Sequence, residues 1–261
     1  MKRFITRSLL FLPIFLFCTS IKPLLKLKDK SYEKEPKHAW VYNAIRKSKA
    51  KDTGAKIVIL GDSVGNQLFT LDKKENSGEI YSLTCTAAID LVGEYILLDE
   101  FLENNKPDVI YLIFSGHRGN LNARQVFHHF LKPFYKEEYK EHFSDMAWDR
   151  IRKIPYYYLS QVPHFLTSTW GPKIPFVPDT TYEIFSPLHI EYLKKIETLA
   201  KEKGIEVIAL PPPIIMPRRK KINQFMRKEI AEHNLDYLFS CLLYTSPSPR
   251  DATLSRMPSS A

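Results

Sequence analysis

Cysteine is scarce in this 261-residue chain, and its scarcity excludes several kinds of site. The three cysteines, Cys18, Cys85 and Cys241, are too few for a disulfide framework and form no CxxC or Cys/His cluster for a structural zinc. The turn after the first predicted strand also lacks a glycine-rich phosphate loop, which disfavours a flavodoxin-like nucleotide-binding protein. We therefore expect no metal and no other cofactor.

Acidic residues are too few to balance the basic ones, but the excess lies mainly at the two ends of the chain. Of the formal net charge of +9, residues 1–30 carry +6 and residues 241–261 carry +1, which leaves +2 for residues 31–240. A nearly neutral central region argues against a nucleic-acid partner. With 44% apolar residues the chain can bury one sizeable core, so we predict one main domain over residues 31–240.

No apolar run reaches the roughly 20 residues that a membrane-spanning helix needs. The run Ser8–Ile21 has 14 uncharged residues, contains Pro13, follows three basic residues and precedes four lysines. This pattern predicts a signal peptide or short membrane anchor over residues 1–30, with Cys18 and Ser20 as small residues of a cleavage site. The expected location is the cell envelope, either membrane-anchored or exported. A buried N-terminal helix is the alternative.

Residues 241–261 do not resemble part of a fold. The segment CLLYTSPSPRD at 241–251 back-translates into a transposase sequencing adapter, and SRMPSSA at 255–261 fits the continuation of that adapter. We expect this tail to be non-native and the natural sequence of this chain to stop near Ser240. A natural, disordered Ser/Pro-rich tail is the alternative.

Short β-branched runs alternate with helical patterns over residues 31–240. Strands are predicted at 56–60, 80–83, 109–114 and 206–210, and their continuous apolar runs imply a sheet covered on both faces. Helices are predicted at 91–102, at 221–233, and from Pro187, after an N-cap at Ser186, to Gly204. The pattern predicts an α/β fold with a doubly wound, flavodoxin-like parallel sheet, and functional groups at the carboxyl ends of its strands. A fifth strand should begin near 235–237, where the tail interrupts it.

Residues 121–185 break this alternation, and we predict an insertion packed over the sheet. Residues 127–185 contain 15 of the 33 aromatic residues and few good helix windows, one of which is 137–152. The rings either form the core of the insertion or offer aromatic faces to a sugar.

The motif Gly61-Asp62-Ser63-Val64-Gly65-Asn66 directly follows the first predicted strand. A serine at a strand-to-helix turn is held at the edge of the sheet, where the N–H groups of the opening helix point toward an oxyanion. Gly61 permits the tight exit from the strand, and Asp62 supports the turn. Ser63 is then either a nucleophile or an unreactive N-cap.

These residues resemble the first block of the SGNH, or GDSL-type, hydrolase superfamily, in which the serine is the nucleophile. The resemblance covers roughly residues 56–240 and implies an oxyanion hole formed by the Ser63 amide, the loop after the second strand and an asparagine after the third. The second loop, 82–88, has no glycine, so the amide of Cys85 or Thr86 is expected to donate. The asparagine is expected to be Asn120, with Asn122 as second choice.

Other side chains in these loops have rival interpretations. His117 or Arg118 either meets an anionic group or faces water, and Cys85 is a rival nucleophile with no base identifiable beside it. The resemblance also implies an Asp-x-x-His motif after the fifth strand, which would supply the base. No such motif stands there before residue 240, so we expect the base beyond it. The other histidines are expected to be solvated or packed: His128, His129, His142, His164 and His189.

The resemblance implies a serine esterase or O-acyltransferase that acts on the acyl groups of cell-envelope glycans. Its partners would be an acylated polysaccharide or small ester and, through residues 1–30, a membrane. This chain would be nearly inactive without its base. The alternative is a non-catalytic SGNH-like envelope protein that serves as a binding scaffold.

Overall fold

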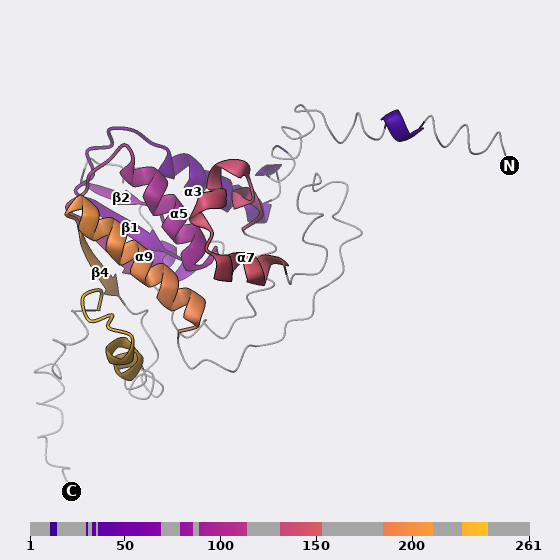
Figure 1. The fold of residues 1–261 in the computed structure, drawn as a ribbon. Coiled ribbons are helices and arrows are strands. Elements are labelled where there is room, and N and C mark those ends of the chain that lie inside the picture. The colour runs from indigo at the N-terminus through magenta and orange to yellow at the C-terminus, as the bar shows by residue number, and fades with distance from the viewer. Residues whose placement is uncertain are drawn as a thin grey trace, which may run out of the picture.

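Four parallel strands form the central sheet of the protein (Figure 1). The computed structural model describes residues 11–14, 30, 33–34, 36–68, 79–85, 89–113, 131–152, 185–210 and 226–239. The strands are β1 (Ile57–Gly61), β2 (Ile80–Ser82), β3 (Val109–Ile113) and β4 (Glu206–Leu210), in the order β2-β1-β3-β4. Neighbouring strands pair in parallel, so the predicted α/β fold with a parallel sheet is confirmed.

The sequence of β1 explains its central position in the sheet. Val58, Ile59 and Leu60 are each at most 2% exposed, and successive side chains of a strand point to opposite faces. Both faces of β1 are therefore covered, as its continuous apolar run predicts. The strand register places Gly61 beside Ile113, and Ile113 beside Leu210, so three strands end together at one edge, called the carboxyl edge below.

Three helices lie side by side over one face of the sheet: α3 (Pro36–Ser48), α5 (Asp90–Leu102) and α9 (Pro187–Lys203), with α5 in the middle (Figure 1). The prediction for α9 is confirmed at both ends, because Ser186 is its N-cap and Gly204 ends it in the left-handed conformation. The prediction for α5 is also confirmed. No helix was predicted where α3 lies.

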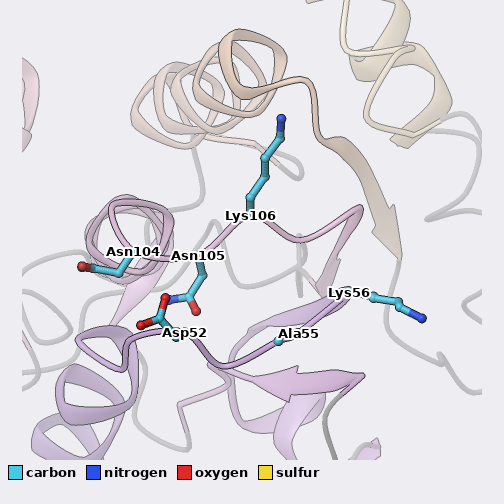
Figure 2. A pocket seen from close by; sticks show the side chains of 7 residues that line it. Asp52, Ala55, Lys56, Asn104, Asn105 and Lys106 are labelled. Atoms are coloured by element: carbon cyan, nitrogen blue, oxygen red, sulfur yellow. The ribbon is translucent and has the colours of Figure 1, made fainter.

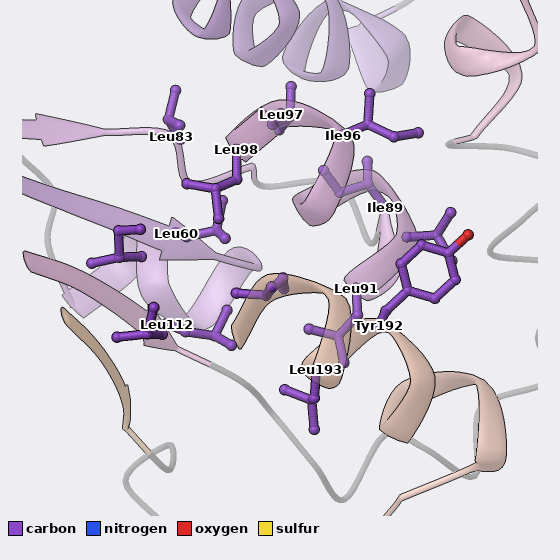
Figure 3. Close-up of a cluster of buried hydrophobic side chains, with 14 of the residues drawn as sticks. Leu60, Leu83, Ile89, Leu91, Ile96, Leu97, Leu98, Leu112, Tyr192 and Leu193 are labelled. Carbon is purple, nitrogen blue, oxygen red and sulfur yellow. The ribbon is translucent and has the colours of Figure 1, made fainter. Parts of the chain in front are cut away.

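The core between sheet and helices holds α5 and α9 in place. Figure 3 shows Leu60 of β1 and Leu112 of β3 pointing toward side chains of α5 and α9, such as Leu98 and Leu193. These four side chains are fully buried, and burial of each stabilises the fold by about 1.5–3 kcal/mol. The helix α5 starts soon after the end of β2, and α9 ends just before β4 begins. Both helices therefore begin at the carboxyl edge.

The described part of the predicted insertion is a short, aromatic-rich layer. It contains the 3-10 helices η2 (Lys132–Phe134) and η3 (Glu137–His142) and the α-helix α7 (Asp145–Arg152). The prediction of a continuous helix over 137–152 is wrong, because Phe143 is extended and the Ser144 hydroxyl accepts the Ala147 N–H to begin α7. Phe134, Tyr139 and Phe143 are buried and belong to the same hydrophobic core as the sheet and its helices. Residues 121–130 and 153–184 of the insertion lie outside the described residues.

The last described segment covers the outer edge of β4. A helix at 226–232 leads into turns, and the Leu238 carbonyl accepts the Ala209 N–H at 2.7 Å. Leu235, Leu238 and Phe239 are buried there. Residues 236–239 are turns, not the strand expected to begin at 235–237.

At the other end of the chain, Phe11, Leu12 and Ile14 belong to a short helical segment and are exposed. Within the described ranges, no helix is both long enough and apolar enough to span a membrane.

Candidate functional site

The turn that carries Ser63 lies at the carboxyl end of β1. Gly61 has a φ of +155°, and a Cβ atom there would lie 2.7 Å from the carbonyl oxygen of Ile113. Only glycine combines this backbone conformation with such a close approach. Gly61 therefore permits the tight exit from β1.

Asp62, and not Ser63, caps the helix α4 (Ser63–Leu68). The Val64 N–H donates to the Asp62 carboxylate at 2.7 Å, and the Asn66 N–H donates to the Asp62 carbonyl at 3.0 Å. These are the two hydrogen bonds of an N-cap residue, so the interpretation of Ser63 as the N-cap is wrong. Ser63 is the first residue of the helix and is half-buried, and its hydroxyl has no hydrogen bond to another described residue. Its hydroxyl is thus not used for local structure within that part of the chain.

The start of α4 is anchored to the neighbouring strands. A Cβ at Gly65 would lie 3.3 Å from side-chain atoms of Ile113 and Thr84, so the helix packs closely there. The Thr84 hydroxyl donates to the Asn66 side-chain oxygen at 3.1 Å and also contacts the Ser82 hydroxyl at 2.8 Å. The Gly65-Asn66 part of the motif therefore fixes the turn against the loop after β2.

Cys85 lies next to this turn, but its amide has a structural partner. The Cys85 N–H donates to the Gly61 carbonyl at 2.9 Å, which continues the pairing of β1 with the segment after β2. An amide directed at Gly61 is not directed at an oxyanion, so the oxyanion role expected of Cys85 does not fit this geometry. Its side chain is 1% exposed, which disfavours the rival role as nucleophile. The alternative donor, Thr86, lies outside the described residues.

The loop after β3 is also outside the described residues. That loop contains Asn120, Asn122, His117 and Arg118, so their predicted roles stay predictions.

A buried pair, Asp90 and His189, joins the first turns of α5 and α9 at the carboxyl edge. His189 Nε2 lies 2.7 Å from Asp90 Oδ1, and the two side chains are 8% and 12% exposed. Sequence reasoning expected a packed or solvated His189 and did not find Asp90 as its partner. The pattern Ser186-Pro187-x-His189 was a usable signal, because it places His189 at the third helical position, where a side chain can bond back to the N-cap.

Both ring nitrogens of His189 are occupied in this arrangement. Nδ1 accepts the Ser186 N–H at 3.4 Å, so Nε2 carries the hydrogen donated to Asp90. Burial raises the pKa of Asp90, but the attraction and hydrogen bond of His189, with help from the Leu91 N–H and Arg150, lower it overall below its ordinary 3.8. A serine triad needs one imidazole nitrogen on the carboxylate and the other on the serine. His189 therefore acts here as a link between two helices and not as a base.

Glu94 adds a third carboxyl group behind the turn. It lies one helical turn after Asp90 on α5 and is 3% exposed. The pKa of Glu94 is raised well above its ordinary 4.5, first by burial and then by the negative charges of Asp62 and Asp90. Burial and both neighbouring carboxylates therefore favour the protonated form of Glu94. Nothing in the sequence except its place on an apolar helix indicated this residue.

His142 also has a carboxylate partner, but away from this turn. Its Nδ1 lies 3.2 Å from Asp99 Oδ2, and the hydrogen bond to Asp99 raises the pKa of His142 above its ordinary 6.5. Asp99 is nine residues beyond Asp90 on α5, about 13 Å along the helix. The described residues contain no group of three or more His, Cys, Asp or Glu side chains arranged to hold a metal.

A hollow of about 400 Å³ lies at the opposite edge of the sheet (Figure 2). Asn105 is one of its lining residues, but its side chain is used within the fold: it accepts from the Thr53 N–H and hydroxyl and donates to the Ala50 and Phe101 carbonyls. Lys56 and Lys106 extend away from each other in Figure 2. This hollow therefore offers no converging set of free polar groups among the labelled side chains.

Comparison of the chain with protein-family models, with curated proteins and with solved structures found no match.

Proposed function

We propose that the protein is an SGNH-like serine esterase or O-acyltransferase with Ser63 as its nucleophile. The observation that carries the proposal is the position of Ser63 directly after the buried strand β1, where Asp62 caps the helix and the Ser63 hydroxyl has no described partner. The strand order β2-β1-β3-β4 supports the finer fold assignment, because it is the order of the first four strands of doubly wound, flavodoxin-like sheets. In such sheets, ligands bind at the carboxyl edge.

In the proposed reaction the Ser63 hydroxyl attacks an acyl carbonyl and forms an acyl-enzyme. The Ser63 amide and Asn120 would donate to the oxyanion, in line with the family resemblance. The base would come from an Asp-x-x-His motif, which we place beyond residue 240 of the natural sequence. Water as acceptor gives ester hydrolysis, and a sugar hydroxyl gives O-acyl transfer.

Acylated envelope glycans are the proposed substrates, and the N-terminal segment is the proposed route to the membrane or across it. The basic residues before the apolar run support this location, as do the exposed Phe11, Leu12 and Ile14.

The proposal is tested with protein that carries its natural sequence after residue 240. Release of acetate from an acetylated glycan is measured for the wild type, Ser63→Ala and the control Ser48→Ala, whose hydroxyl bonds only a carbonyl of its own helix α3. We expect Ser63→Ala to lose at least about a thousandfold in kcat and Ser48→Ala to keep its activity. Undiminished hydrolysis by Ser63→Ala would show that Ser63 is not the nucleophile.

A binding scaffold is the second candidate, and the contacts of Cys85 and His189 favour it. The Cys85 amide is bonded to Gly61, and both nitrogens of His189 are occupied, so neither group serves an acyl transfer reaction as it stands. As a scaffold, the wild type and the Ser63→Ala variant would bind the acylated glycan equally well, and neither would release acetate.

A further inference from the structure

A tryptophan lies on the outward side of α3. Trp40 is 48% exposed and has the largest side chain among the exposed apolar residues of the described ranges. The inward side of the helix packs on the core, since Val41 and Ala44 are at most 2% exposed. Single exposed apolar side chains are common on soluble proteins, so the partner of Trp40 has to be inferred from the charges around it.

The net positive charge before residue 241 is confined to α3 and the segment that leads into it. Residues 1–30 carry +6 and residues 31–48 carry +2, so residues 49–240 have no net charge. Basic residues that follow an apolar segment are attracted to anionic lipids at a membrane surface. The helix α3 contains three basic residues and no acidic one: Lys37, Arg46 and Lys47.

The basic groups at the end of α3 are accessible, and one of them shares a side of the helix with Trp40. Lys47 follows Trp40 by seven residues, which places both on one side of the helix, and its ammonium donates to the Ser82 carbonyl at 3.3 Å. The Arg46 side chain is 69% exposed, and Glu33 lies 4.0 Å from it. Such an exposed pair is weak and leaves the guanidinium able to meet another anion.

The helix α3 begins on the side of the sheet where the Ser63 turn lies. Its end lies beside the end of α5, because Lys49 Nζ is 3.6 Å from Glu100 Oε2 and the Asn105 side chain donates to the Ala50 carbonyl. The two helices lie side by side in Figure 1, so they run in the same direction. Since α5 begins at the carboxyl edge, the chain enters α3 from that edge.

We propose that the outward side of α3 docks on an anionic membrane surface, with the Trp40 ring among the lipid headgroups and the basic residues against lipid phosphates. Tryptophan suits this position because its ring is apolar and its N–H is polar. The exposed Lys30 and Lys34 extend the basic surface toward the N-terminal segment. The contact holds the carboxyl edge closer to the lipid than the opposite edge. The inference rests on the proposed membrane location and not on a catalytic role of Ser63.

The test measures quenching of tryptophan fluorescence by brominated lipid, with the full chain on vesicles. The vesicles contain phosphatidylglycerol and a phosphatidylcholine with bromine atoms near the headgroup end of its acyl chains, and unbrominated vesicles give the reference. We expect the wild type to be quenched and Trp40→Phe to lose most of that quenching. Trp148→Phe is the matched control and should keep it, because the Trp148 ring packs against Phe143 at 5.0 Å.

A second probe tests the orientation. Tyr237 is 43% exposed, nearly as much as Trp40, and Lys201 near the end of α9 lies 4.3 Å from its ring. Because α9 ends at the opposite edge, a tryptophan placed there by Tyr237→Trp in the Trp40→Phe variant should not be quenched.

Salt separates this contact from anchoring by the N-terminal segment. In about 1 M salt the Debye length is only about 3 Å, so the attraction between basic residues and lipid is screened. Quenching of Trp40 should then fall, while the protein still sediments with the vesicles through its apolar run.

Three results would overturn the inference: undiminished quenching in Trp40→Phe, equal quenching at position 237, or a protein that sediments with the vesicles but shows no quenching at Trp40. In the last case, a Trp40 emission that shifts to shorter wavelength as protein concentration rises would assign this face to a second copy of the chain. A protein that does not sediment with the vesicles would refute the proposed location as well. Release of acetate tests the role of Ser63 separately.

Discussion

At the scale of single residues, Gly61 shows how closely the Ser63 turn approaches β3. A Cβ at this position would meet a backbone oxygen of Ile113, which cannot rotate away as a side chain could. We predict that Gly61→Ala lowers the free energy of unfolding by about 2–5 kcal/mol through backbone strain and overpacking.

Gly204→Ala is the matched control for this prediction. Gly204 also has a positive φ, of +68°, but a Cβ there would meet nothing within 4 Å. Its cost should be about 1–2 kcal/mol, from backbone strain alone. Urea unfolding of the two variants compares them directly, and equal losses would contradict the close packing of the turn.

The pair of Asp90 and His189 leads to a second prediction at this scale. His189→Ala leaves a buried carboxylate without its partner and removes the side-chain bond to the Ser186 N–H. We expect a loss of about 3–5 kcal/mol in the free energy of unfolding, measured by urea titration at pH 7.

An exposed ion pair on another helix provides the comparison. Lys228 and Glu232 lie 3.6 Å apart with side chains 70% and 53% exposed, so Lys228→Ala should cost less than about 0.5 kcal/mol. If His189→Ala were equally mild, the buried pair would not hold α5 and α9 together.

At the scale of secondary structure, Asp62 and Ser63 have different roles in the Gly61-Asp62-Ser63 motif. Asp62 caps α4, whereas Ser63 is the proposed nucleophile. Asp62→Ala removes the acceptor for the Val64 N–H and should cost about 0.5–2 kcal/mol, whereas Asp62→Asn keeps an acceptor and should cost less. Thermal unfolding ranks the variants. Ser63→Ala should leave stability almost unchanged, because the Ser63 side chain has no described hydrogen bond to lose. If Ser63→Ala were as unstable as Asp62→Ala, this would show that Ser63 caps α4.

Prediction from sequence succeeded for elements whose apolar pattern and end signals are local. The helix α9 has Ser186, Pro187 and Gly204 at its ends, and each acts through bonds within a few residues. Prediction failed over 137–152, where the helical periodicity continues through Phe143 although the backbone is extended there. The bond from the Ala147 N–H to the Ser144 hydroxyl begins α7 as a separate helix.

At the scale of the whole molecule, the pKa shifts of three groups allow us to predict how the free energy of unfolding varies with pH. The pKa of Asp90 is lowered in the folded state, so its contribution is present above pH 3.8 and is lost as the pH falls through its folded value. The pKa values of Glu94 and His142 are raised, so their contributions are complete below about 4.5 and 6.5, respectively, and are lost as the pH rises through their folded values. These groups place the maximum of stability in mild acid.

Urea midpoints measured from pH 3 to pH 9 check this prediction. In Glu94→Gln the decline above pH 4.5 should become shallower by up to about 1.4 kcal/mol per pH unit, the slope of one proton. A decline that is identical in the wild type and in Glu94→Gln would mean that other groups control the alkaline side.

The sequence by itself determined the strands, two of the three helices over the sheet and the position of Ser63 after β1, because each depends on residues that are neighbours along the chain. Only the tertiary structure decided that Asp90 meets His189 across 99 positions, that Asp62 takes the cap, and that burial raises the pKa of Glu94. Those outcomes depend on which side chains the parallel sheet and the packing of α5 against α9 bring to one edge, and on how much water they exclude there. Burial and the charges of residues distant in sequence leave no local sequence pattern, so these outcomes could not be predicted from the order of the residues alone.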